Sequence, residues 1–117
     1  MLLHILAVGD VVMETGLRHL EKHLRPLKKL KNISFTVVNG ENAAGVGLTQ
    51  DQAERMYDAG ADVITLGNHA FGKTQISQAL DDLPWLLRPA NFSGRAPGRG
   101  CGIYEINGLR ILSLIHI

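Results

Sequence analysis

The sequence predicts an α/β fold built on a largely parallel sheet with helices on both faces, and two observations lead to this prediction. Short apolar runs, typical of buried strands, alternate three times with segments whose apolar residues recur at helical spacing. The chain then becomes rich in β-type patterns, and Asn107-Gly108 separates two apolar runs as a type I′ hairpin turn does. Strand–helix alternation of this kind joins parallel strands through helical crossovers.

The composition is that of a single globular domain or part of one. The chain has 117 residues, of which 45% are hydrophobic and 20% charged, so it can bury a core. A formal net charge of +1 gives no strong attraction to nucleic acid or to a membrane surface. Cys101 is the only cysteine, which excludes an internal disulfide, and the apolar residues 2–8 are too few to span a membrane. We therefore expect a cytoplasmic protein without membrane contact.

The elements of the first half follow from apolar spacing and from helix-ending residues. In order, we expect a strand at residues 2–8, a helix at about 17–30, a strand at 33–38 and a helix at about 50–59. Pro26 interrupts the apolar stripe of the first helix and predicts a kink or a restart there. Thr49 is a good N-cap for the second helix, and Gly60 is suited to end it.

The second half continues the alternation and ends in the hairpin. In order, we expect a strand at residues 63–66, a helix at about 74–83, a strand at 85–88 and hairpin strands at 103–106 and 109–115. Pro84 stops the helix, and a loop dense in Gly, Pro and Arg precedes the hairpin.

Three oxygen-bearing side chains follow three predicted strands. Asp10, Glu41 and Asn68 each stand just past a strand, and the carboxyl ends of parallel strands meet at one edge of a sheet. Two carboxylates and an amide oxygen are hard ligands that suit Mg²⁺, Mn²⁺ or iron. A pair of such ions clamps a phosphate and activates water, so the pattern predicts a divalent-metal site acting on phosphate esters. The alternative is that these residues cap turns or helices.

His69 stands beside Asn68 and could serve as a general acid toward a leaving group. The alternative is a loop histidine that hydrogen bonds to a backbone carbonyl. Further along, Arg88 and Asn91 could help to hold phosphate, although a solvated loop explains them equally well.

A second motif gives a different function. The segment from Gly67 to Thr74 fits the pattern G-x-x-x-x-G-K-[ST] of a phosphate-binding loop, which would make the protein a nucleotide-binding ATPase. Against it, the loop carries the bulky His69 and Phe71, whereas a nest of backbone N–H groups favours small residues. The motif also leaves Glu41 without a role. A non-catalytic binding module is a third alternative.

Several motifs together resemble those of the calcineurin-like metallophosphoesterases, and among them the YmdB-like bacterial branch. They are Gly9-Asp10-Val11-Val12, Asn39-Gly40-Glu41-Asn42-Ala43-Ala44, Gly60-Ala61-Asp62 through Gly67-Asn68-His69, and Leu87-Arg88-Pro89-Ala90-Asn91-Phe92. The resemblance covers nearly the whole chain. It implies a layered α/β/β/α sandwich, of which residues 1–117 would be the N-terminal portion of a single domain.

The resemblance also implies a function and a role for each site residue. Asp10 would bind one metal, Glu41 would bridge two, Asn68 would bind the second, and His69 would be the general acid. Asn42 and Asn91 would lie in the second shell or contact the substrate. Two divalent ions, iron or manganese, would be the cofactors. The substrate class would be phosphodiesters such as 2′,3′-cyclic nucleotides, with nucleic acid relevant only as an RNA-derived product, and the full-length protein would be a homo-oligomer.

The chain departs from the pattern of that branch at several points. Met13 stands where the branch usually has glycine, and Phe71-Gly72 stands where it often has Trp-Asp. The family completes its metal shell with three histidines from later loops, which this chain lacks, so we expect a fragment with weak metal binding and little activity alone. The last six residues, 112–117, match the translation of a transposase adapter used in sequencing libraries. We expect them to be an assembly artefact, with a natural edge strand as the alternative.

Overall fold

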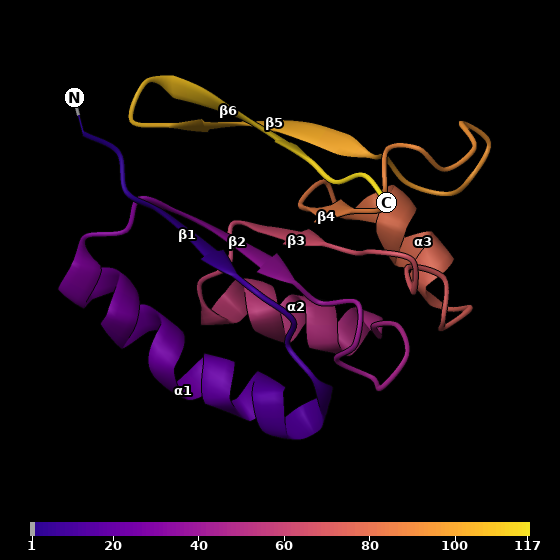
Figure 1. The fold of residues 1–117 in the computed structure, drawn as a ribbon, viewed down its shortest axis with the longest axis horizontal. Helices are drawn as coiled ribbons and strands as arrows, with labels where there is room; N and C mark the ends of the chain where they lie inside the picture. The colour runs from indigo at the N-terminus through magenta and orange to yellow at the C-terminus, as the bar shows by residue number, and fades with distance from the viewer. Residues whose placement is uncertain (1) are drawn as a thin grey trace.

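The computed structural model describes residues 2–117 and contains the alternating strands and helices that the sequence predicts. The helices are α1 (Met13–Lys31), α2 (Gln50–Ala59) and α3 (Ile76–Asp82). The strands are β1 (Ile5–Val8), β2 (Phe35–Asn39), β3 (Val63–Thr65), β4 (Leu86–Leu87), β5 (Cys101–Ile106) and β6 (Leu109–Leu114). Figure 1 shows their arrangement.

The first four strands form one parallel sheet in the order β1-β2-β3-β4, so each new strand is added beside the previous one. Strands β5 and β6 pair antiparallel as a separate hairpin around Asn107-Gly108. This arrangement confirms the predicted class, a mostly parallel sheet with flanking helices and a C-terminal hairpin. Because sequential strands always advance in the same direction, crossovers of one hand place every helix on the same face.

The two faces of the sheet have different partners. Side chains alternate along a strand, so Val38, Ile64 and Leu86 point to one face, where they join residues of all three helices in the main core. Phe35, Val63 and Leu87 point to the other face and pack with Tyr104 and Ile111 of the hairpin. The expectation of helices on both faces is therefore wrong: in Figure 1 helices α1 and α2 lie on one side of the sheet and the hairpin on the other.

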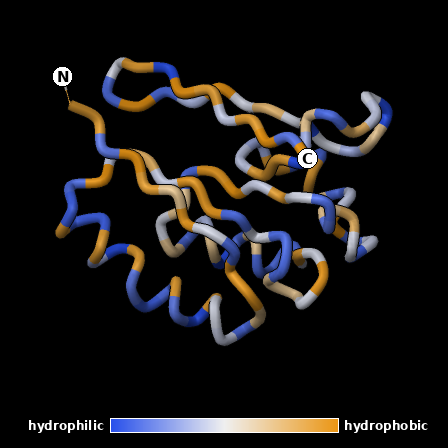
Figure 2. The backbone as a smooth tube through the Cα atoms, viewed as in Figure 1, coloured by the Kyte–Doolittle hydropathy of each residue, from blue (hydrophilic) through white to orange (hydrophobic). Residues whose placement is uncertain are grey.

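Local signals place some boundaries better than others. Helix α2 spans the predicted residues because Thr49 and Gln52 form a reciprocal capping box and Gly60 follows with φ of 122°. Helix α1 passes through Pro26 without ending and begins at Met13, before the predicted start. Its buried residues are Leu17, Leu20 and Leu24, and Figure 2 shows the matching alternation of hydrophobic and hydrophilic residues along it.

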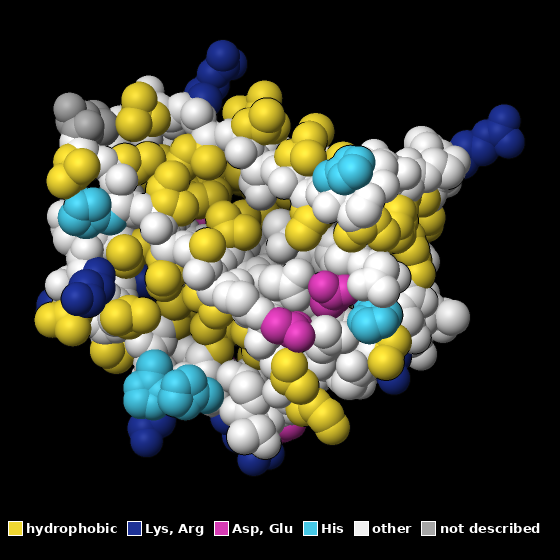
Figure 3. Space-filling view, in the orientation of Figure 1, with side chains coloured by type: hydrophobic (Ala, Val, Ile, Leu, Met, Phe, Trp, Pro, Cys, Tyr) yellow, Lys and Arg dark blue, Asp and Glu magenta, His cyan; other side chains and the backbone are white. Residues whose placement is uncertain are grey.

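The surface carries exposed apolar side chains as well as polar ones. Ile103 and Leu112, which pair across the hairpin, are 63% and 61% exposed, so the outer face of the hairpin is uncovered among residues 2–117. On the face that Figure 3 turns to the viewer, hydrophobic side chains lie among polar ones. None of the helices described in these residues has the length and apolar character needed to cross a bilayer.

Candidate functional site

The predicted site lies at the carboxyl ends of β1, β2 and β3. Asp10 is two residues beyond β1, Glu41 is two residues beyond β2, and His69 follows β3. Backbone hydrogen bonds continue past the strands and hold these ends together: Val11 N donates to Asn39 O at 3.2 Å, and Gly40 N donates to Thr65 O at 3.0 Å. Figure 3 shows acidic side chains beside a histidine on this part of the surface.

Glu41 is held against the turn that follows β3. Its Oε2 accepts from the backbone N–H of His69 at 3.2 Å, and its Oε1 accepts from Asn39 Nδ2 at 3.4 Å. The Glu41 carboxylate can occupy this position only because residue 67 is glycine: a Cβ there would overlap the carboxylate. The glycine thus allows the backbone after β3 to lie against the Glu41 carboxylate, which follows β2.

Asp10, Asn42 and His69 form a chain of hydrogen bonds across the three strand ends. Asn42 Nδ2 donates to Asp10 Oδ1 at 3.1 Å and to Oδ2 at 3.0 Å. On its other side, Asn42 Oδ1 lies 2.8 Å from His69 Nδ1. The structure therefore brings four of the predicted residues, Asp10, Glu41, Asn42 and His69, into one polar cluster.

The other predicted residues are placed differently. Asn68 lies exposed between Gly67 and His69 at the same strand end. Asn91 is outside the cluster, because its side chain donates to Ile117 O at 2.6 Å and accepts from Ile117 N at 3.1 Å. Arg88 is only 5% exposed and donates to the backbone carbonyls of Pro89, Ala96, Pro97 and Gly98. It organises its own loop and is not free for an anion.

Asn39 and Gly67 are residues of the site that sequence reasoning did not assign. Asn39 binds both the side chain and the main chain of Glu41, since its Oδ1 also accepts from the Glu41 backbone N–H at 3.3 Å. The sequence feature that could have identified Asn39 is its position in the motif Asn39-Gly40-Glu41-Asn42. For Gly67 the sequence indicates a sharp turn, but the contact with Glu41 comes from a neighbouring strand.

Two glycines pack the loop after β2 against the loop after β3. A Cβ on Gly47 would lie 2.9 Å from Lys73 N, and a Cβ on Gly72 would lie 2.8 Å from Val46 O. Gly47 also has φ of 91°, which disfavours other residues. The loop that carries Glu41 and Asn42 is thus fixed against the loop that carries His69.

The loop after β3, residues 67–74, does not have the geometry of a nucleotide phosphate-binding loop. The N–H groups of His69, Ala70 and Gly72 already donate within the protein, to Glu41 Oε2, Gly67 O and His69 O. Helix α3 begins at Ile76, beyond the Lys73-Thr74 pair that should open it. The motif match at residues 67–74 is therefore a coincidence of sequence.

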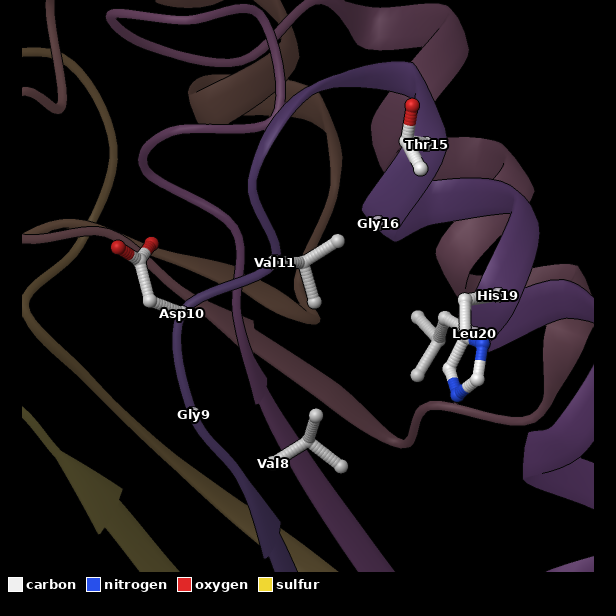
Figure 4. A pocket seen from close by; sticks show the side chains of 8 residues that line it. All are labelled: Val8, Gly9, Asp10, Val11, Thr15, Gly16, His19 and Leu20. Carbon is white, nitrogen blue, oxygen red and sulfur yellow. The ribbon is translucent and has the colours of Figure 1, made fainter.

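A hollow of about 580 Å³ adjoins the cluster on the α1 side, as Figure 4 shows. Val8, Val11 and Leu20 line it together with His19, and in this view the Asp10 carboxylate points away from them. Asp10 also lines this hollow, so the hollow meets the polar cluster at that residue. Within residues 2–117, no three side chains of His, Cys, Asp or Glu are grouped as a metal site.

Solved structures with the same fold define the class of protein. A hypothetical protein from Thermus thermophilus matches with a TM-score of 0.85 and 33% identity, covering 94% of this chain and 43% of that one. A phosphatase from Mycoplasma pneumoniae matches with a TM-score of 0.84 and 28% identity, covering 94% and 41%. The chain therefore has the α/β fold of phosphatase-type proteins.

The particular family follows from the sequence. The chain belongs to the YmdB-like protein family, whose model matches residues 6–117, and this confirms the resemblance drawn from the motifs. A 2′,3′-cyclic-nucleotide 2′-phosphodiesterase from Bacillus subtilis (strain 168) is 42% identical over 116 residues. That match covers 98% of this chain and 44% of the relative, so the chain spans less than half the length of the proteins it matches.

Proposed function

We propose that a protein of the relatives' length carrying this chain is a metal-dependent phosphodiesterase that acts on small phosphodiesters such as 2′,3′-cyclic nucleotides. The observation that carries the proposal is the cluster of Asp10, Glu41, Asn42 and His69 at one rim of the sheet. Such a rim is where α/β proteins bind ligands. The name of the Bacillus subtilis relative supports the substrate class.

The donor set fits divalent cations. The carboxylates of Asp10 and Glu41 are acceptor groups, and each oxygen keeps lone-pair capacity beyond the hydrogen bonds described above. The exposed amide of Asn68 offers a third oxygen. We propose that Asp10, Glu41 and Asn68 would hold two divalent ions, iron or manganese. When bound, they would polarise the phosphoryl oxygen and favour ionisation of an attacking water.

His69 would supply the proton that the leaving group needs. As the P–O bond to the leaving oxygen breaks, the imidazolium form of His69 would transfer a ring proton to that oxygen and be left as neutral imidazole. The backbone of His69 is held by Glu41 and its ring by Asn42, so the donor is fixed before substrate binds. We further place the protein in the cytoplasm as a homo-oligomer, with RNA-derived cyclic nucleotides as the only nucleic-acid product involved.

The test combines metal binding with hydrolysis. Mn²⁺ is titrated into the 117-residue chain, and the broadening of backbone NMR signals identifies the residues around the ion. We expect weak binding centred on Asp10, Glu41 and Asn68, which Asp10→Asn and Glu41→Gln reduce. In a protein of the relatives' length, the same substitutions should lower the hydrolysis of 2′,3′-cyclic AMP by at least about 10²-fold.

Lys73→Ala is the matched control for the rejected nucleotide loop. It should leave metal binding and hydrolysis unchanged, because the proposed chemistry does not use Lys73. Loss of ATP binding in this variant would support the ATPase instead. Full function of Asp10→Asn and Glu41→Gln would contradict the phosphodiesterase and favour a binding module.

A further inference from the structure

We propose that Asn107 is a site of spontaneous isoaspartate formation, and that the fold protects Asn39 from the same reaction. Asn39-Gly40 and Asn107-Gly108 are the two Asn-Gly pairs of the sequence. Glycine after asparagine makes this reaction fast, because a residue without a side chain leaves its backbone nitrogen unhindered. The two pairs have the same chemistry, so their environments in the fold decide which of them reacts.

The reaction is an attack by a backbone nitrogen on the preceding side chain. The deprotonated nitrogen of Gly108 bonds to Cγ of Asn107, and the side-chain nitrogen leaves as ammonia, which gives a cyclic succinimide. Water then opens the ring at one of its two carbonyl carbons, and the product is aspartate or isoaspartate. In isoaspartate the main chain runs through the former side-chain carbons. The net change consumes one water and releases one ammonia, without an oxidant or a reductant.

The environment of Asn107 leaves this reaction open. Asn107 and Gly108 form the exposed turn between β5 and β6, which Figure 1 shows at the free end of the hairpin. Their φ angles are 51° and 78°, as a type I′ turn requires. Among residues 2–117 no protein acceptor bonds to the Gly108 N–H, and a Cβ at Gly108 would meet nothing within 4 Å. Opening of the turn alone therefore lets the Gly108 nitrogen reach the Asn107 side chain.

Asn39-Gly40 lies instead where three strand ends meet. The Gly40 N–H donates to Thr65 O at 3.0 Å, and Asn39 O accepts from Val11 N at 3.2 Å. The Asn39 side chain is held by its two hydrogen bonds with Glu41, and Gly40 is buried. The Gly40 nitrogen can attack only after the sheet opens here, which costs more free energy than opening an exposed turn.

Isoaspartate at this turn should loosen the hairpin. The modified residue lengthens the main chain within a two-residue connection, whose geometry fixes the pairing of Ile106 with Leu109. Tyr104 and Ile111 attach the same hairpin to the face of the sheet that the helices leave free. The modification would therefore weaken the cover of that face without touching the polar cluster at the strand ends.

The experiment compares the two asparagines within one sample of the 117-residue chain. The chain is incubated at mildly alkaline pH, which favours the deprotonated glycine nitrogen, and peptide mapping with an isoaspartyl methyltransferase measures isoaspartate at each position. We expect Asn107 to react at least about 10-fold faster than Asn39. In urea the two should react at similar rates, because the protection of Asn39 is lost. Asn107→Gln should remove the signal from the hairpin peptide, because the larger ring that glutamine must form closes far more slowly.

Each outcome decides the proposal. Equal rates at Asn39 and Asn107 in the chain without urea would overturn the protection by the fold. An unmodified Asn107 in a sample whose urea control reacts would overturn the site itself. None of these measurements depends on metal binding or hydrolysis, so failure of this proposal is distinct from failure of the proposed function.

Hydrogen exchange then tests the structural consequence. The modified chain carries an additional negative charge, so ion exchange separates it from the unmodified chain. Amide exchange should be faster in residues 101–114 of the modified chain and unchanged in α2, which serves as the internal control. Unchanged exchange in the hairpin would contradict the loosening.

Discussion

Met13 is the residue whose backbone conformation fits its side chain least. It has φ of 60°, in the left-handed region, although it is neither glycine nor asparagine. That conformation costs an ordinary residue roughly 1–2 kcal/mol. Glycine would adopt such a φ without penalty. The N–H of Met13 bonds to Asn42, so this strained residue adjoins the site.

Met13→Gly should therefore stabilise the chain. Relief of the strained φ is partly offset by the larger conformational entropy of glycine in the unfolded state, so we expect a net gain of about 0.5–1 kcal/mol in the free energy of unfolding. Little packing is lost, since Met13 is 55% exposed. Urea unfolding followed by circular dichroism measures the change. Met13→Ala keeps the strain and serves as the control; equal stability of the two variants would contradict this explanation.

At the residue scale, the sequence predicted those members of the site that follow a strand directly. Asp10, Glu41 and His69 could be placed because a parallel sheet brings its strand ends together. Gly67 could not be assigned, since its contact with Glu41 depends on the distance between neighbouring strand ends. Asn39 is only two residues from Glu41, and its contact depends on the local side-chain geometry after β2. Asn91 also follows a strand but bonds to Ile117, because the chain end passes beside it.

At the element scale, boundaries were predictable where the ending signal is local. Thr49 and Gly60 determine both ends of α2 by hydrogen bonds and backbone conformation within a few residues. For α3 the sequence predicts a start near Thr74, whereas the helix begins at Ile76 after a series of turns. No capping side chain marks that start, so the apolar pattern alone could not fix it.

Thr49→Ala should destabilise the chain by about 1 kcal/mol, because it removes the acceptor for the Gln52 N–H at the start of α2. The loss should also loosen the Glu41 loop, since Gln52 Nε2 donates to Ala43 O at 3.0 Å. Faster amide exchange in residues 43–48 would report this effect. Thr49→Ser keeps the hydroxyl and should retain most of the stability; an equal loss in Thr49→Ser would show that the cap is not the cause.

At the scale of the whole molecule, the sequence predicted the class of fold but not the side of the sheet that each layer covers. Both sheet faces read as apolar in strands such as β2 and β3, which is equally consistent with helices or with a second sheet as cover. The strand order determines which face the helices cover, and that order arises from pairing between strands far apart in the sequence. The hairpin then covers the face that the helices leave free.

Tyr104 joins the hairpin to the sheet and should make the chain sensitive to alkali. Burial raises the pKa of its phenol above the ordinary value of 10.0, and its hydroxyl donates to Pro84 O at 2.8 Å. Above pH ~10 the unfolded phenol loses its proton while the native one keeps it, so the unfolded state binds fewer protons. The free energy of unfolding should therefore fall as pH rises from the unfolded toward the native pKa.

Urea unfolding between about pH 9 and 11 measures this fall. In Tyr104→Phe the phenol is absent, so the part of the slope that it causes should disappear, together with about 1 kcal/mol of stability at neutral pH from the lost hydrogen bond. Tyr57→Phe, at a 44% exposed tyrosine, is the control and should keep the wild-type slope. An unchanged slope in Tyr104→Phe would assign the alkaline sensitivity to other groups.

The contact of Gly47 with Gly72 means that the two loops of the site are interdependent parts. A relative with a side chain at the position of Gly72 must accommodate it by a different path of residues 43–48, and that path carries Asn42 and Glu41 with it. Chimeras that transplant one loop between members of the family would therefore misplace the donors of the other. Engineering of this rim should exchange both loops as a matched pair.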